Sequence, residues 1–162
     1  MSRFGSLSVY REPASLRMLF LGFSSGLPLL LVLGTLSFWL RESGIDLKTI
    51  GFMSWVGLCW GLKWVWAPLV DRLRIPLLTR RLGRRRAWLL LSQIGLAAGL
   101  AAMAFCDPAR NLDTVIACAL VTAFFGATQD ISLDAFRIES GNEKEQAALA
   151  AMYQTGYRFA ML

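Results

Sequence analysis

The stretch that decides the fold is MLFLGFSSGLPLLLVLGTLSFWL, residues 18–40, which contains no charged side chain. As a helix it would extend roughly 34 Å, enough to cross a hydrocarbon core about 30 Å thick. It is too long for a signal-peptide core, and no small-residue cleavage site follows it, so we expect it to be retained. The sequence therefore predicts a membrane-spanning helix over this stretch.

Working outward, four further apolar segments follow. We predict complete spans over about 50–70, 87–106 and 114–133, and a fifth that begins near residue 147 and is still apolar at residue 162. The 162-residue chain is 56% hydrophobic, with a mean hydropathy of +0.50. The prediction is an all-α integral membrane protein with four full spans and part of a fifth, which we interpret as the front part of a longer protein.

The formal charge of +6 raises the possibility of a nucleic-acid binder. The distribution of charge argues against it, because seven arginines lie within residues 72–86, between two apolar segments. The three cysteines are widely spaced and the chain has no histidine, so we expect packing cysteines, no metal site and no cofactor. Proton handling would then rest on carboxylates, lysine or tyrosine.

The short flanks of the spans predict the orientation through their Lys and Arg content. Arg3, Arg11 and Arg17 precede the first span, and the seven arginines lie between the second and third. The other two connections between these spans hold only Arg41 with Lys48, and Arg110. We expect a cytoplasmic amino terminus and a cytoplasmic arginine-rich connection.

Lys63 lies about seven residues, or roughly 10 Å, inside the second predicted span. One interpretation is a lysine that extends toward the headgroups within a tryptophan-rich interface. The other is a cation in a water-filled cavity, which would meet an anionic substrate or pair with a carboxylate. In that case Trp60, Trp64 and Trp66 supply flat apolar walls suited to sugar rings.

Asp130 and Asp134 are four residues apart near the end of the fourth span, on one helical face, and Arg137 is placed to pair with Asp134. Because two close carboxylates repel each other, the deeper Asp130 is the candidate proton site. The alternative is that both acids are hydrated at a helix end. In the fifth segment, Arg158 belongs to a polar stripe and is either an anion ligand or a member of an internal ion pair.

Glycine and proline add packing predictions. Three GxxxG pairs, Gly22 with Gly26, Gly57 with Gly61, and Gly95 with Gly99, favour close helix contacts. Pro28 should bend the first span, beside Ser25, whose hydroxyl either satisfies the backbone or meets a ligand.

Asp71-Arg72, a linker and then Gly83-Arg84-Arg85-Arg86 resemble the loop signature GxxxDRxGRRR of the major facilitator superfamily. Ala67 stands where the first glycine would be, and residues 73–82 separate the two halves. More narrowly, the stretches GFSSGLP, IDLKTIGF, WAPLVDR, GRRRAWLL and ATQDISLDAF resemble the muropeptide permeases of the AmpG type. Acetyl-CoA transporter-like proteins share parts of this pattern.

The resemblance implies an incomplete N-terminal six-helix half of a major facilitator superfamily fold, spanning residues 1–162. It implies a multi-pass protein of the bacterial inner membrane that imports muropeptides, anhydro-muramyl disaccharide-peptides, by proton symport. A transporter of another organic anion such as an acyl-CoA is the alternative, followed by a non-transporting membrane scaffold or an enzyme. No nucleophile with a base and an orienting group is evident, so we expect no enzyme. The expected partners are a small-molecule substrate, protons and the bilayer, with no nucleic acid.

The candidate site residues fall into three groups. The substrate group comprises Lys63, Trp60, Trp64, Ser25, Gln129 and Arg158. Asp130 is the proton-coupling candidate. By analogy with the superfamily, a cytoplasmic gate is formed by Asp71, Arg72, Gly83, Arg84, Arg85, Arg86 and Asp134. We expect Asp134 to join this gate through Arg84 or Arg86.

Overall fold

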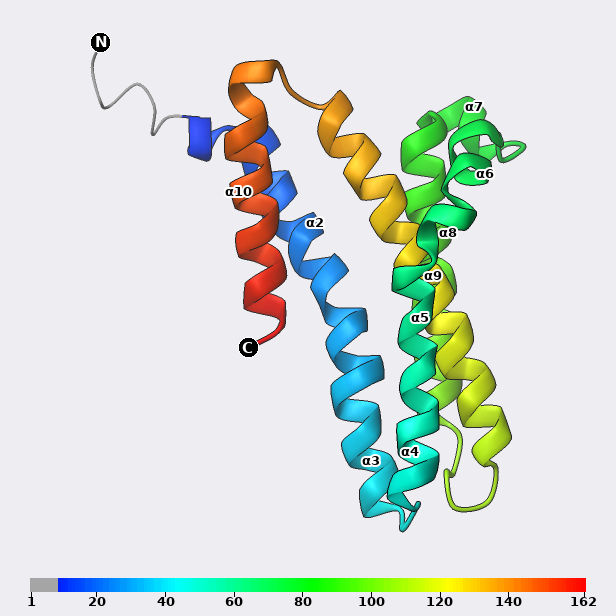
Figure 1. The fold of residues 1–162 in the computed structure, drawn as a ribbon. Coiled ribbons are helices and arrows are strands. Elements are labelled where there is room, and N and C mark those ends of the chain that lie inside the picture. The colour runs from blue at the N-terminus through cyan, green and yellow to red at the C-terminus, as the bar shows by residue number, and fades with distance from the viewer. Residues whose placement is uncertain (1–8) are drawn as a thin grey trace. The chain divides into compact units, whose positions relative to one another are not determined.

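The computed structural model describes residues 9–162, and the regular elements within that range are helices (Figure 1). The chain forms two compact units. The terminal unit comprises the described residues up to Leu27 together with Leu133–Leu162, and the central unit is Pro28–Ser132. Arg3, used above to predict the orientation, lies outside the described residues.

Three of the described helical stretches are long and apolar enough to cross a membrane: Pro13–Glu42, Arg84–Ala104 and Leu112–Glu139. The first consists of α2 (Pro13–Leu29), η2 (Leu30–Thr35) and α3 (Leu36–Glu42). The other two are α8 (Arg84–Ala104) and α9 (Leu112–Glu139). They overlap three predicted spans and confirm the prediction of an all-α membrane protein.

The first span changes helix type just after Pro28. This proline is buried, and the π-helical turn η2 begins two residues later. Proline has no backbone N–H, so it removes one hydrogen bond of the α-helical ladder. The local departure from α-helix lies where the sequence predicted a bend.

The predicted span over 50–70 is instead a succession of short helices. They are α4 (Leu47–Met53), η3 (Ser54–Gly57), α5 (Leu58–Gly61), η4 (Lys63–Val65) and α6 (Ala67–Arg72). Gly57 and Gly61 weaken helix propagation, and Pro68 in the first turn of α6 has no N–H to donate. That this stretch crosses the membrane stays a prediction, as it does for α10 (Glu143–Ala160).

Asp46 starts the short-helix stretch as the N-cap of α4. Its carboxylate accepts hydrogen bonds from the backbone N–H groups of Lys48 and Thr49 and from the Thr49 hydroxyl. The Thr49 side-chain hydrogen bond, followed by the Thr49 backbone, lowers the pKa of Asp46 below its usual range. An ionised cap at this position also suits the positive end of the helix dipole.

In the central unit, α8 and α9 pack through small residues. A Cβ added at Gly99 would meet the Thr122 side chain at 2.5 Å, and one at Gly95 would meet the Phe125 ring at 2.5 Å. Beside this contact lies an apolar core contributed by η2, α3, the short helices, α8 and α9: Val32, Leu36, Leu40, Met53, Val56, Met103, Val115, Ala119 and Ala123. Gly57 contacts the Leu33 side chain, whereas Gly61 has open space around it.

In the terminal unit, α2 and α10 lie side by side (Figure 1) with their backbones in close approach. A Cβ at Gly22 would overlap the carbonyl of Tyr153, and one at Gly156 would overlap the carbonyl of Leu19. Gly26 faces Tyr157 of α10 in the same way. The first GxxxG pair therefore lies at a helix contact, as predicted, and Gly156 completes it from the partner helix.

The connection from α9 to α10 is closed by hydrogen bonds. The Gln146 side-chain amide donates to the carbonyls of Ile138 and Gly141, each at 2.9 Å. Asn142 and Glu145 form a reciprocal capping box at the start of α10. These bonds satisfy backbone groups at a helix end and a helix start.

Between α6 and α8, the chain makes a tight turn and the short helix α7 (Leu78–Leu82). Leu77 has a φ of 69°, and the Leu78 N–H donates to the Pro76 carbonyl at 2.9 Å. This is a γ-turn centred on a leucine, a conformation that is rare and strained for a residue with a Cβ. Gly83, with a φ of 81°, then precedes α8.

Candidate functional site

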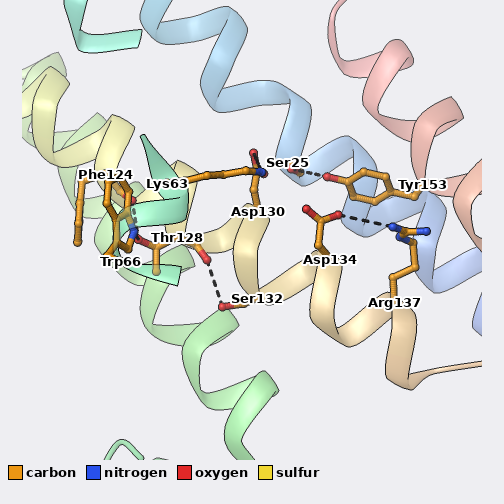
Figure 2. Close-up of polar contacts among 10 residues, drawn as sticks. All are labelled: Ser25, Lys63, Trp66, Phe124, Thr128, Asp130, Ser132, Asp134, Arg137 and Tyr153. Carbon is orange, nitrogen blue, oxygen red and sulfur yellow. Dashed lines mark hydrogen bonds and ion pairs between the residues drawn. The ribbon is translucent and has the colours of Figure 1, made fainter. Parts of the chain in front are cut away.

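Lys63 of η4 pairs with Asp130 of α9 in the central unit (Figure 2). The distance from Lys63 Nζ to Asp130 Oδ2 is 3.9 Å, and the side chains are 33% and 10% exposed, respectively. Lys63 lies at the break between α5 and α6, so a short turn rather than a continuous helix presents its side chain. Asp130 is nearly buried while Lys63 keeps a third of its side chain exposed, so the lysine charge compensates the more buried carboxylate.

The turn of α9 that carries Asp130 is polar and buried. Gln129 is 1% exposed, and Thr128 and Ser132 are buried beside it. The hydroxyls of Thr128 and Ser132 donate to carbonyls one turn earlier, at 2.7 and 3.1 Å. This arrangement satisfies the hydroxyls locally.

Trp66 fixes the chain after Lys63 against the same turn. Its indole N–H donates to the Thr128 hydroxyl oxygen at 3.2 Å, and its ring lies 5.2 Å from that of Phe124, centroid to centroid (Figure 2). These contacts hold the chain three residues after Lys63 onto the part of α9 that lies two and six residues before Asp130. Trp66 was predicted only as a neighbouring wall, and Thr128 was not predicted.

The other two tryptophans predicted to form walls of the site, Trp60 and Trp64, differ in how far they are buried. Trp60 is half-buried, and its indole packs over Gly126 of α9, 3.0 Å from where a Cβ would stand. Trp64 is 68% exposed. Trp60 therefore packs on the helix that carries Asp130, whereas Trp64 presents most of its surface outward.

Asp71 at the end of α6 forms a hydrogen-bonded ion pair with Arg85 in the first turn of α8. Asp71 is 47% exposed and Arg85 is 16% exposed. Gly83 permits the positive φ from which α8 starts. The structure thus brings together the two halves of the predicted gate signature, Asp71 and the arginine run, across the ten residues that separate them.

The remaining gate residues surround this pair or lie in the other unit. Arg84 is half-buried, while Arg72 and Arg86 are exposed. In the terminal unit, Asp134 Oδ1 lies 3.8 Å from Arg137 Nη2, which is the pairing expected from their spacing. The expected pairing of Asp134 with Arg84 or Arg86 stays a prediction.

Two further candidates belong to the terminal unit. Ser25 is buried, and its hydroxyl shares a 3.0 Å hydrogen bond with the Tyr153 hydroxyl of α10 (Figure 2). Arg158 is exposed and lines an open groove on α10 with Gln154 and Phe159. Tyr153 belongs to the polar stripe of the fifth segment, but no sequence signal indicates that its hydroxyl meets Ser25.

Among residues 9–162, no three His, Cys, Asp or Glu side chains converge so as to hold a metal ion. What the central site offers is one cation and one carboxylate within a buried polar turn. In such a pair the lysine can bind an anion in place of the aspartate, and the aspartate can bind a proton in place of the lysine.

A protein-family model described as "Acetyl-coenzyme A transporter 1" matches residues 16–108, more than half of the chain. The chain belongs to this family. The match covers the first span, the short-helix stretch with Lys63, the Asp71–Arg85 pair and all of α8. Membership of a transporter family, together with the three apolar helices, makes this a membrane protein.

Curated relatives extend the match over nearly the whole chain. The chain is 46% identical over 156 residues to the anhydromuropeptide permease of Escherichia coli K12, which covers 96% of this chain and 31% of the permease. It is 35% identical over 154 residues to the putative transporter AmpG 4 of Rickettsia conorii, covering 95% of this chain and 37% of the relative. The chain thus spans about a third of the length of these relatives, and the predicted resemblance to AmpG-type permeases is confirmed.

Proposed function

We propose that this chain is part of a secondary active transporter that imports anhydro-muramyl disaccharide-peptides across the bacterial inner membrane by proton symport. The similarity to a relative named anhydromuropeptide permease over 96% of the chain supports the substrate class. The observation that carries the mechanism is the Lys63–Asp130 pair. Orientation with a cytoplasmic amino terminus follows from the arginine distribution.

In this proposal Lys63 binds a carboxylate of the substrate and Asp130 carries the coupled proton. Protonation of Asp130 neutralises the internal partner of Lys63, which makes the lysine charge available to an anion. When the proton leaves, the restored carboxylate competes for Lys63 and favours release of the substrate. Proton and substrate would then move together, because each binds best when the ion pair between Lys63 and Asp130 is open.

The other candidate residues have supporting roles. Trp60, packed on α9, offers an apolar face to a sugar ring, and Gln129 offers a buried amide one residue before Asp130. Trp64, Ser25 and Arg158 remain proposed substrate contacts. The Asp71–Arg85 pair is proposed to act as a cytoplasmic latch that holds one access state, with Arg72, Gly83, Arg84, Arg86 and Asp134 completing the gate.

Transport of another organic anion such as an acyl-CoA is the second candidate. The description of the matching family model, acetyl-coenzyme A transporter, favours it specifically. The two substrates share negative charge and a large polar body, so a lysine paired with a carboxylate suits both. Competition distinguishes them, because excess acyl-CoA would abolish muropeptide uptake only if it occupied the same site.

The test uses the native-length protein that carries this chain, reconstituted in vesicles and supplied with labelled anhydromuropeptide, with and without an inward proton gradient. We expect accumulation to depend on the gradient and to be lost in Lys63→Ala, with partial retention in Lys63→Arg. Lys48→Ala is the matched control, since Lys48 is an exposed lysine at the start of α4. Undiminished gradient-driven uptake by Lys63→Ala would contradict the assignment.

The latch has its own test, because a functional ion pair should tolerate exchange of its two charges. Asp71→Arg and Arg85→Asp should each reduce uptake strongly, and the double variant should recover a substantial part. A double variant no better than the worse single variant would remove the pair from the gating scheme.

A further inference from the structure

The connection between α6 and α8 carries the most concentrated charge in the chain. We call residues 72–86 the arginine loop; it holds seven arginines and no acidic residue. Arg72, Arg74, Arg80 and Arg81 are all exposed. The gate signature includes Arg72 and the three arginines after Gly83. It gives no role to the arginines among residues 73–82, which separate its two halves: Arg74, Arg80 and Arg81.

The same loop exposes large apolar side chains among these arginines. Leu77 is 72% exposed, Leu73 is 47% exposed and Leu82 is 40% exposed. Leu77 is also the centre of the γ-turn, so a strained backbone presents this leucine outward. Hydration alone does not account for three exposed leucines beside the five exposed arginines of the loop, which include Arg86.

Both ends of the loop are tied to the start of a membrane-capable helix. Asp71 pairs with Arg85 in the first turn of α8, and the Trp88 indole N–H donates to the Leu73 carbonyl at 3.1 Å. Tryptophan is enriched at the level of the lipid headgroups, and α8 is long enough to cross the bilayer. These contacts tie the arginine loop to the first turns of α8, where the headgroups of a bilayer crossed by this helix would lie.

We propose that the arginine loop is a docking surface for anionic phospholipid headgroups, with its exposed leucines inserted at the boundary of the acyl chains. Interspersed basic and apolar side chains at a membrane surface are the combination that anionic lipid attracts. An acidic soluble protein would match the arginines, but it would not account for apolar groups held beside a membrane-spanning helix. The proposal concerns the lipid alone and stands whichever substrate the transporter carries.

The test places an environment-sensitive fluorophore at Leu77→Cys in a variant whose Cys59, Cys106 and Cys118 are replaced by Ala. The native-length protein is reconstituted in phosphatidylcholine vesicles, with and without phosphatidylglycerol, each containing a lipid-attached quencher. We expect strong quenching only with phosphatidylglycerol, and loss of that quenching in high salt, because salt screens charges at a surface.

Arg80→Gln with Arg81→Gln should then weaken the dependence on phosphatidylglycerol about 25-fold, since each of the two basic residues near the surface contributes about a fivefold preference. The matched control is Arg41→Gln with Arg110→Gln, two exposed arginines of other connections, which should leave the preference unchanged. Thermal unfolding of both double variants shows that each is folded.

Three results would overturn the proposal. They are a fluorophore equally exposed to water in both kinds of vesicle, quenching that is as strong in phosphatidylcholine alone, and an effect of the control variant equal to that of Arg80→Gln with Arg81→Gln. The comparison of lipids and the salt arm need no arginine variant, so they decide the matter even if the arginine variants do not fold.

Discussion

The helix pair of the terminal unit and the short-helix stretch of the central unit are held by different kinds of contact. In the terminal unit, α2 and α10 meet backbone to backbone through Gly22, Gly26 and Gly156. In the central unit, the short-helix stretch is joined to α8 and α9 by ion pairs and by the indole of Trp66. Close-packed glycine contacts do not depend on protonation, whereas ion pairs do.

The difference separates a fixed contact from a switchable one. Backbone contact between helices gains dispersion energy and has no second arrangement of similar stability close by. An ion pair can lose its partner to a proton, an anion or another charge. A transporter needs both kinds, and the residues proposed to bind proton and anion, Asp130 and Lys63, form one of the switchable contacts of the central unit.

The largest effect should come from breaking the Lys63–Asp130 pair on one side. Asp130→Ala leaves the Lys63 charge without its aspartate and should reduce the free energy of unfolding by about 2.5 kcal/mol, less than for a fully buried pair because Lys63 is a third exposed. Lys63→Met combined with Asp130→Leu should recover most of this loss, because no buried charge remains, while transport stays absent. Thermal unfolding in detergent measures both, and equal stability of Asp130→Ala and the parent protein would show that the pair is hydrated.

The glycine contact should respond to size rather than to charge. Gly156→Ala places a Cβ against the backbone of Leu19 and Phe23, so the helices must separate, at a cost of about 2 kcal/mol. Gly51→Ala is the matched control, since Gly51 lies inside α4 with open space around it, and there the change should raise helix stability slightly. Unfolding temperatures that move in the same direction would contradict the close approach of α2 and α10.

The sequence predicted the membrane fold well and the site only in pieces. Apolar stretches of sufficient length indicate spanning helices directly, which is why α8, α9 and the first span were found. Each GxxxG pair was visible, but spacing alone cannot tell Gly22, which meets a backbone, from Gly61, which meets nothing. That distinction depends on which helix lies opposite.

The Lys63–Asp130 pair could not be derived from sequence for a similar reason. Both residues were singled out as costly charges within apolar segments, yet they are 67 positions apart. The break between α5 and α6 turns the Lys63 side chain toward α9. Low helix propensity at Gly57, Gly61 and Pro68 indicated that the helix would be interrupted. It did not indicate toward which helix the Lys63 side chain would then point.

The contact that holds the switchable region in place should have an intermediate effect. Trp66→Phe keeps the ring beside Phe124 but removes the hydrogen bond to Thr128, and we expect a loss of about 1 kcal/mol. If this contact positions η4, uptake should fall by more than the change in stability explains. Wild-type uptake by Trp66→Phe would show that the ring alone positions the turn.

The smallest expected effect is at the exposed cap of α4, which tests pH dependence away from the membrane interior. Because the Thr49 hydrogen bonds lower the pKa of Asp46, its ionised form stabilises the fold at neutral pH. This contribution is lost as the pH falls through the lowered pKa. Asp46→Asn keeps a capping oxygen without the charge, so the difference in unfolding temperature between the two proteins should shrink in acid. A difference that does not change with pH would contradict an ionised cap.

The central claim is that Lys63 and Asp130 contact each other directly. Solid-state NMR in lipid bilayers tests it most directly, with nitrogen-15 in the lysines and carbon-13 in the aspartate carboxyls. We expect a dipolar coupling between Lys63 Nζ and the Asp130 carboxyl carbon, consistent with the 3.9 Å from Nζ to the carboxylate oxygen, and its disappearance in Lys63→Arg. A resolved Lys63 signal with no coupling to any aspartate carboxyl would contradict it.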